Sequence, residues 1–161
     1  MKGSIIRRII ELVRQAQELA SRIGMPNILQ PGLVKEMVIA DVLGHQLIPA
    51  KHGADAYDPE DPNVKYEYLS CLEGGTGQLD RVFKEPPQAR KESLTRISRN
   101  NKIYLAIFFR AEPLKLKVIY ELEPTDVVEK TNEKLNNSRN DISHVGFSES
   151  WAKEKGRIIY P

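Results

Sequence analysis

The segment IYLAIFFR at residues 103–110 is an almost uninterrupted run of apolar side chains. Such a run is typical of a strand that is buried on both faces of a sheet. After the turn AEP, the segment LKLKVIYEL at residues 114–122 begins in strict alternation, which predicts a paired strand with one wet face. VKYEYLSCL at residues 64–72 is rich in β-branched and aromatic residues, as strands are. These three segments predict the centre of a β-sheet.

Helical patterns surround this predicted sheet. Apolar residues recur at helical spacing over residues 4–23, with Ser4 as the expected N-cap and Gly24 as the expected stop. Further helices are predicted over residues 31–44, after the prolines within residues 84–102, and over residues 126–135. EGGTGQ at residues 73–78 predicts a flexible loop, and GRIIY at residues 156–160 a short closing strand. The expected fold class is α/β (α+β), with a central mixed β-sheet flanked by helices in one domain, 1–161.

The composition narrows the class of protein. A chain of 161 residues fits one domain, and its net charge of +2 favours nucleic acid only weakly, so that DNA binding has to rest on local charge. The single cysteine, Cys71, excludes an internal disulfide framework. No apolar run reaches the roughly 18 residues of a membrane span. Arg7, Arg8 and Arg14 interrupt the first apolar pattern, unlike a signal peptide. We expect a cytoplasmic protein that has no membrane partner.

The candidate chemistry lies in GADAYD at residues 53–58 and KYEYL at residues 65–69. Asp55 is expected to end one strand and Glu67 to lie in the next, so that the two carboxylates converge if the strands are neighbours. Converging carboxylates stay ionised most easily around a divalent cation, and oxygen ligands of this kind suit Mg²⁺. Mg²⁺ can activate water and stabilise phosphate charge during hydrolysis. The alternative is a pair of solvated surface acids with no shared ligand.

The order and spacing of several segments resemble the PvuII-like type II restriction endonucleases of the PD-(D/E)xK nuclease superfamily. The similar segments are GMPNILQPGLVKEMVIADVLGHQLIPAKHGADA, KYEYLS, IYLAIFFR, VIYELEPTDV, NDIS and GRIIY. The resemblance implies a restriction-endonuclease-like fold, in which Asp55 and Glu67 are metal ligands and the backbone carbonyl of Tyr68 is a third. It also implies a homodimer that cuts double-stranded DNA with Mg²⁺.

The sequence departs from that family at the lysine two positions after the metal glutamate, where it has Leu69. An ammonium there stabilises negative charge as it develops, whereas an isobutyl group offers neither charge nor a hydrogen bond. Three explanations are open. Leucine stands in for lysine in an inactivated form, or Lys65 supplies the amine from the same strand face. In the third, the protein is naturally impaired or recruits a lysine such as Lys84 or Lys91.

Candidate DNA contacts follow, along the chain, the predicted strand that carries Glu67. The densest basic run comprises Lys84, Arg90, Lys91, Arg96, Arg99 and Lys102, and its alternative role is an ordinary solvated helix face. The family's base-reading histidines are replaced here, and Gln88 and Arg90 are able to read adenine and guanine. Ser143, beside His144, replaces the family's C-terminal recognition asparagine. His52 is a further candidate for assisting DNA or metal. Recognition is therefore expected to differ from that of the family.

Three functions compete at this point. The first is a Mg²⁺-dependent type II restriction endonuclease that acts as a homodimer on a short palindromic site. The second is a catalytically impaired, sequence-specific DNA-binding protein of the same fold. The third is an α/β interaction protein unrelated to nucleic acid. The N-terminal helix, over residues 4–23, either contributes to the dimer interface or packs on its own core.

Overall fold

The computed structural model describes residues 2–49 and 53–161. The chain forms two compact units, residues 1–34 and residues 35–161. The first unit holds one long helix and the loop that follows it. The second unit holds the sheets and the remaining helices, and all the candidate catalytic residues lie in it.

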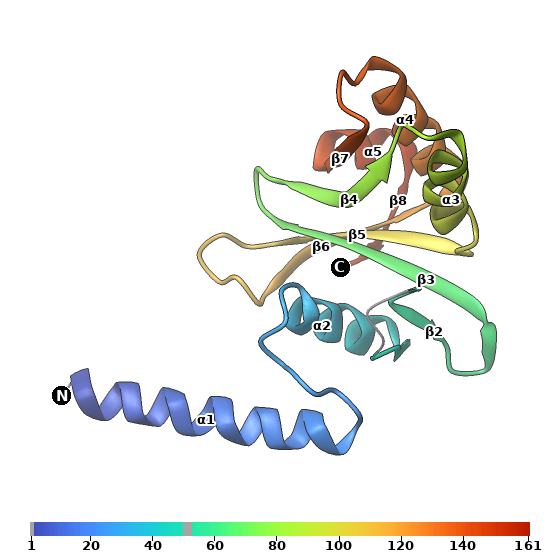
Figure 1. Cartoon of the computed structure of the whole chain (residues 1–161). Coiled ribbons are helices and arrows are strands. Elements are labelled where there is room, and N and C mark those ends of the chain that lie inside the picture. The colour runs from blue at the N-terminus through green and yellow to red at the C-terminus, as the bar shows by residue number, and fades with distance from the viewer. Residues whose placement is uncertain (1, 50–52) are drawn as a thin grey trace. The chain divides into compact units, whose positions relative to one another are not determined.

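The helix of the first unit is α1 (Lys2–Arg22), drawn in blue in Figure 1. It begins before Ser4, so the predicted N-cap role of Ser4 is wrong, because that residue lies inside the helix. The predicted stop is confirmed: Gly24 has a φ of 81°, a left-handed backbone that favours glycine. The exposed large apolar side chains of α1 are Ile5, Ile6, Ile9, Ile10, Leu12, Val13 and Leu19, followed by Ile23 just after the helix.

The central sheet of the second unit is mixed and six-stranded, in the order β1-β2-β3-β5-β6-β8. Its strands are β1 (Gln46–Leu47), β2 (Ala56–Asp58), β3 (Asp61–Leu72), β5 (Lys102–Phe108), β6 (Leu116–Leu122) and β8 (Arg157–Tyr160). The pair β3 and β5 is parallel and the other pairs are antiparallel. The expectation of a central mixed sheet flanked by helices is confirmed.

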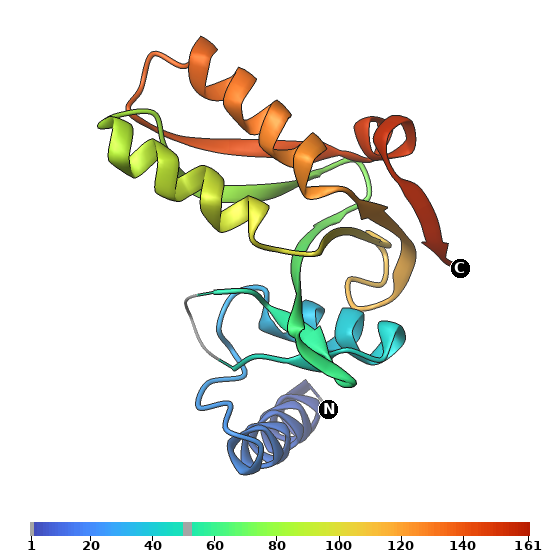
Figure 2. The ribbon, with the colours of Figure 1, turned by 90° about the vertical axis from the view of Figure 1, so that its right-hand side faces the viewer.

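A second, two-stranded sheet pairs β4 (Thr76–Phe83) with β7 (Ile142–Ser148). The helices α3 (Pro87–Ser98) and α4 (Pro124–Asn137) lie side by side near it (Figure 2), and α5 (Glu149–Lys155) follows β7. The opposite face of the central sheet carries α2 (Leu33–Leu43) (Figure 1). The loop expected over residues 73–78 is shorter than predicted, because β4 begins at Thr76.

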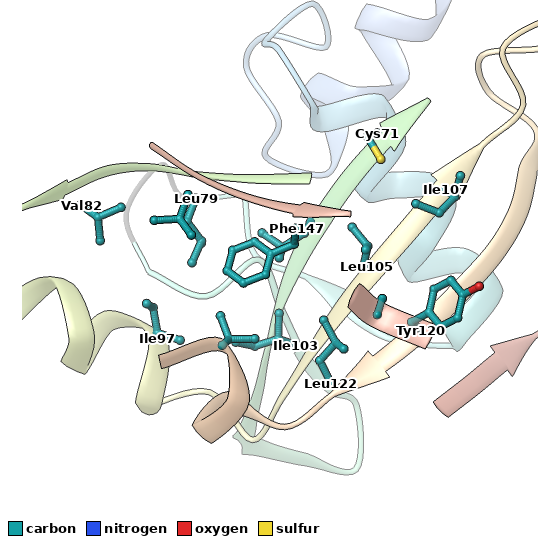
Figure 3. Packing of buried hydrophobic residues seen from close by; sticks show 14 of the residues in the cluster. Cys71, Leu79, Val82, Ile97, Ile103, Leu105, Ile107, Tyr120, Leu122 and Phe147 are labelled. Carbon is teal, nitrogen blue, oxygen red and sulfur yellow. The ribbon is translucent and has the colours of Figure 1, made fainter. Parts of the chain in front are cut away.

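Two apolar clusters fill the two faces of the central sheet. One lies toward β4, β7, α3, α4 and α5, and includes Leu105, Leu79 and Phe147 (Figure 3). The other lies toward α2 and includes Ile39, Tyr66 and Tyr68. We call these the β4-side and the α2-side core. The expected wet face of residues 114–122 is wrong over β6, where five of its seven residues are buried, because both cores cover it.

Alternation along β3 divides its side chains between the two cores. Tyr66 and Tyr68 enter the α2-side core, whereas Leu69 and Cys71 enter the β4-side core. Glu67 shares the face of Leu69 because successive side chains of a strand point to opposite faces. The candidate acid is therefore placed at the edge of the β4-side core.

Candidate active site

Asp55 is held against β3 by both its backbone and its side chain. Its N–H donates to the Tyr66 carbonyl at 2.9 Å, and its carboxylate Oδ2 accepts from the Tyr68 N–H at 2.7 Å. The residue directly precedes β2 and does not end a strand, which corrects the predicted position. The convergence itself is as expected, because β2 is the antiparallel neighbour of β3.

Glu67 lies half-buried on β3, beside Asp55. Burial, followed by the charge of Asp55, raises the pKa of Glu67 to about 8, although the charges of Arg96 and Arg99 act in the opposite direction. Burial likewise raises the pKa of Asp55 to about 6, against the opposing effect of the Tyr68 N–H. Two buried carboxylates thus lie close enough for the charge of one to disfavour ionisation of the other.

A third carboxyl group, which the sequence analysis did not single out, lies near this pair. Burial, together with the charge of Asp55, raises the pKa of Glu36, on α2, to about 7. The available signal was an acidic residue that, with Lys35, interrupts the apolar first half of that helix. Among the described residues, no three His, Cys, Asp or Glu side chains are arranged to hold one metal ion together. The charge of Glu36 adds to the effects that raise the pKa of Glu67.

The donors present fit a divalent cation. Glu67 Oε2 is buried and accepts no hydrogen bond from any residue that the structure describes, an expensive state for a carboxylate oxygen that has no ligand. The N–H and C=O of one strand residue point to the same side, so the Tyr68 carbonyl is directed to the side on which its N–H reaches Asp55. Asp55, Glu67 and this carbonyl are the oxygen donors that Mg²⁺ takes, with water completing the shell.

A cavity of about 620 Å³ opens in front of the two acids. The face of α3 forms much of its wall, and an arginine just beyond the helix extends it. The lining residues are Gly53, Asp55, Glu67, Gln88, Lys91, Glu92, Thr95, Arg96 and Arg99. We call this space the site cavity. It brings paired carboxylates and three cationic side chains around a single volume.

The wall formed by α3 is firmly attached to the rest of the unit. Ile97 is buried in the β4-side core, and the Ser93 hydroxyl accepts from the Phe83 N–H at 3.0 Å. At the helix end, the Asn100 side chain donates to the carbonyls of Arg96 and Ile97 at 3.1 and 3.2 Å. The cationic side chains of α3 therefore project from a fixed support.

Leu69 lies in the β4-side core and is only 2% exposed. β4 approaches it closely at Gly77, where an added Cβ would lie 2.9 Å from the Leu69 Cβ and 2.6 Å from the Leu105 Cδ1. Glycine is required there by this close approach of two strands. The position that holds lysine in the resembled family is thus an apolar, well-packed one in this chain.

The other candidate lysines occupy different surroundings. Lys91 lines the site cavity. Lys65 is exposed on β3 and is not among the described residues of the cavity wall. Lys84 donates from Nζ to the Ser138 carbonyl at 2.8 Å, at the end of β4. Of these three, the structure brings only Lys91 to the acidic pair.

The predicted base-reading residues are similarly divided. Gln88 lines the site cavity and donates to Glu92 at 2.9 Å. Arg90 is turned toward α4, where its guanidinium donates to the side-chain carbonyls of Asn132 and Asn136 at 2.5 and 2.6 Å. A base contact from Arg90 would require these two bonds to break.

The C-terminal candidates lie on β7. Ser143 is 8% exposed, and its hydroxyl is 2.7 Å from that of Ser138, so a base contact would require this pair to separate. His144 is exposed, and its Nδ1 is 2.8 Å from the Asp80 carboxylate. His52 lies outside the described residues.

Comparisons with known proteins add no family assignment. Neither a scan against protein-family models nor a search of curated proteins finds a match for this chain. None of the described helices combines the length and the apolar character needed to cross a membrane.

Proposed function

We propose that this chain is a Mg²⁺-dependent type II restriction endonuclease of the PD-(D/E)xK fold that hydrolyses duplex DNA as a homodimer. The observation that carries the proposal is the convergence of Asp55 and Glu67 at one wall of a cavity whose other wall is cationic. Carboxylates suit a divalent cation, and lysine and arginine suit phosphate oxygens. A phosphodiester that enters this cavity meets both.

The residues have separate roles in this proposal. Asp55 and Glu67, with the Tyr68 carbonyl, would hold Mg²⁺, which supplies Lewis-acid stabilisation of phosphate charge and activation of water. The Tyr68 N–H fixes the Asp55 carboxylate from behind at 2.7 Å. Lys91, Arg96 and Arg99 bind the DNA backbone at the cavity. Gln88 is part of the same cavity wall, from which its side chain would contact a base edge.

The homodimer rests on α1. Seven large apolar side chains of this helix are exposed, and Ile9, for example, is 54% exposed. Large exposed apolar surfaces mark interaction sites. A second copy is the partner proposed, because two-fold symmetry places two cutting sites on the two strands of a palindrome.

A second candidate function is a catalytically impaired, sequence-specific DNA-binding protein of the same fold. The burial of Leu69 in the β4-side core favours it, because no ammonium is present at the lysine position of β3. Such a protein would retain duplex DNA with an affinity that falls steeply with salt.

The decisive experiment is cleavage of plasmid DNA in Mg²⁺ by the wild-type chain, Asp55→Asn and Glu67→Gln. A matched control is Glu112→Gln, which removes an exposed carboxylate whose ion-pair partner among the described residues is Lys115. We expect discrete fragments from the wild type and the control, and none from the two site variants. Cleavage that survives both site substitutions would refute the nuclease assignment.

Duplex binding, measured by fluorescence anisotropy across a salt series, separates the remaining functions. Salt-dependent binding without cleavage would establish the binding-protein alternative. Absence of both binding and cleavage would favour an interaction protein unrelated to nucleic acid.

A further inference from the structure

The site cavity is lined by two arginines that differ in how firmly their side chains are held. Arg96 is anchored, since its Nη2 donates to the Asp80 carbonyl on β4 at 2.9 Å. Arg99 is exposed and, across residues 2–49 and 53–161, its guanidinium has no hydrogen-bond or ion-pair partner. Both side chains line the cavity with Glu67, and both are near enough for their charge to act on that carboxylate.

The two arginines act on Glu67 without contacting it. Neither forms an ion pair with Glu67 or Asp55 within the described part of the chain. Arginine binds carboxylate and phosphate groups through paired hydrogen bonds, so an unpaired guanidinium beside two carboxylates can accept a phosphate that enters between them. The cavity of about 620 Å³ is large enough to admit a phosphate group between the charges.

β3, which carries Glu67, offers no cation two residues after it, because Leu69 is packed into the β4-side core against Gly77 and Leu105. Lys65, two residues before Glu67, is not among the described residues that line the cavity. α3, by contrast, ends with its cationic side chains at the cavity. The carbonyl end of a helix stabilises such cations, and Asn100 fixes that end through the carbonyls of Arg96 and Ile97.

We propose that Arg99, with Arg96 beside it, supplies from the end of α3 the positive charge at the scissile phosphate that β3 lacks at Leu69. This inference rests on the proposed nuclease function. In the hydrolysis, the oxygen of a water bonds to phosphorus and one P–O ester bond breaks. One water proton passes to the leaving alcohol oxygen and the other stays with the phosphomonoester, so no oxidant or reductant is needed. The arginines neutralise the charge that gathers on the phosphate oxygens during this exchange.

The test compares cleavage rates of the wild-type chain, Arg99→Gln, Arg99→Lys and Leu69→Lys in Mg²⁺. Removing one preorganised charged donor from a developing oxyanion lowers kcat by about 10²–10³-fold, and we expect this for Arg99→Gln. Arg99→Lys keeps the charge but loses the planar fork, so it should recover part of the rate. Arg139→Gln, which removes an exposed arginine outside the cavity, is the matched control and should cleave at the wild-type rate.

Binding of a duplex in Ca²⁺, without turnover, provides the second readout. Loss of an Arg99 that acts on the reacting phosphate lowers kcat far more than it weakens binding, whereas loss of a residue that only holds DNA weakens binding and leaves kcat unchanged. Weaker binding with an unchanged kcat, or wild-type cleavage by Arg99→Gln, would overturn the inference and leave the nuclease assignment standing.

The Leu69→Lys variant separates this inference from the proposed function. If the wild type is silent and Leu69→Lys cleaves, the chain has the fold and acids of a nuclease, and the arginines of α3 do not replace the lysine. If neither protein cleaves, both the inference and the proposed function fail.

Discussion

Replacing Leu69 by lysine tests whether this position belongs to the core or is a vacated catalytic position. Leu69 is 2% exposed and is packed beneath Gly77 of β4. Fully burying a leucine side chain is worth roughly 1.5–3 kcal/mol. The lysine stem retains part of this burial, but its ammonium must leave water, which costs more unless the charge is paired. Pairing with Glu67, two residues along the same strand face, would return some of that cost.

The sum of these effects predicts that Leu69→Lys lowers the free energy of unfolding by about 2–4 kcal/mol. For a chain of this size, such a loss corresponds to a Tm about 5–15 °C lower. Urea denaturation followed by circular dichroism measures the free energy directly. The slope against urea should stay constant, because the native state exposes no additional surface.

Two further variants set the scale of this measurement. Leu69→Met nearly conserves volume and should cost less than about 1.5 kcal/mol. Leu114→Lys introduces the same charge at a leucine that is 56% exposed, and should leave stability unchanged. If Leu69→Lys proves as stable as Leu114→Lys, the reasoning from burial is refuted, and the position is one built for lysine that has lost it. A large loss of stability means that leucine belongs there.

Three other predictions concern packing, pH and assembly. Gly77→Ala should destabilise the fold by about 1–3 kcal/mol in the same urea assay, and the double variant with Leu105→Ala, which removes the 2.6 Å contact, should cost less than the two changes summed. Because the pKa values of Asp55 and Glu67 are raised to about 6 and about 8, these carboxyls favour the folded state at pH values below their ordinary pKa, and that contribution is lost as pH rises to about 8. Mg²⁺ binds the ionised forms, so it should raise Tm more at pH 8 than at pH 6, and an equal effect at both would contradict the site. Ile9→Glu should shift a dimer to a monomer in sedimentation experiments, and a wild type that sediments as a monomer would contradict the α1 interface.

The acidic pair could be predicted from the sequence because its two residues lie close together along the chain. Asp55 and Glu67 lie on either side of one short antiparallel turn, so strand alternation alone brings their carboxylates together. The buried strand at residues 103–110 could also be predicted, since its apolar run corresponds to β5 (Lys102–Phe108). Glu36 escaped notice because its proximity to Asp55 depends on how α2 packs against the sheet, which no local pattern specifies.

The second sheet could not be predicted from local sequence patterns. β4 contains Gly77 and follows two other glycines, so its sequence indicates a loop. It is a strand because its partner is β7, and Thr76 pairs with Ser148, far along the chain. The glycine that makes the segment resemble a loop is the one that lets it approach Leu69 and Leu105. Arg90 is a similar case, since only the tertiary packing of α3 on α4 brings it to Asn132.

The Tyr68 amide offers a view of the site that requires no turnover. Its hydrogen is held by the Asp55 carboxylate, whereas the N–H of Asp55 is held by the Tyr66 carbonyl in an ordinary backbone bond. Exchange of the Tyr68 amide with deuterated solvent therefore depends on where one side chain lies, whereas amides of β3 that donate to a carbonyl of a neighbouring strand exchange only when the strands separate. A cation that draws the Asp55 carboxylate away would accelerate that single exchange, and one that fixes it in place would slow it. Occupancy of the proposed metal site would therefore be measurable as a change in the exchange rate of one hydrogen.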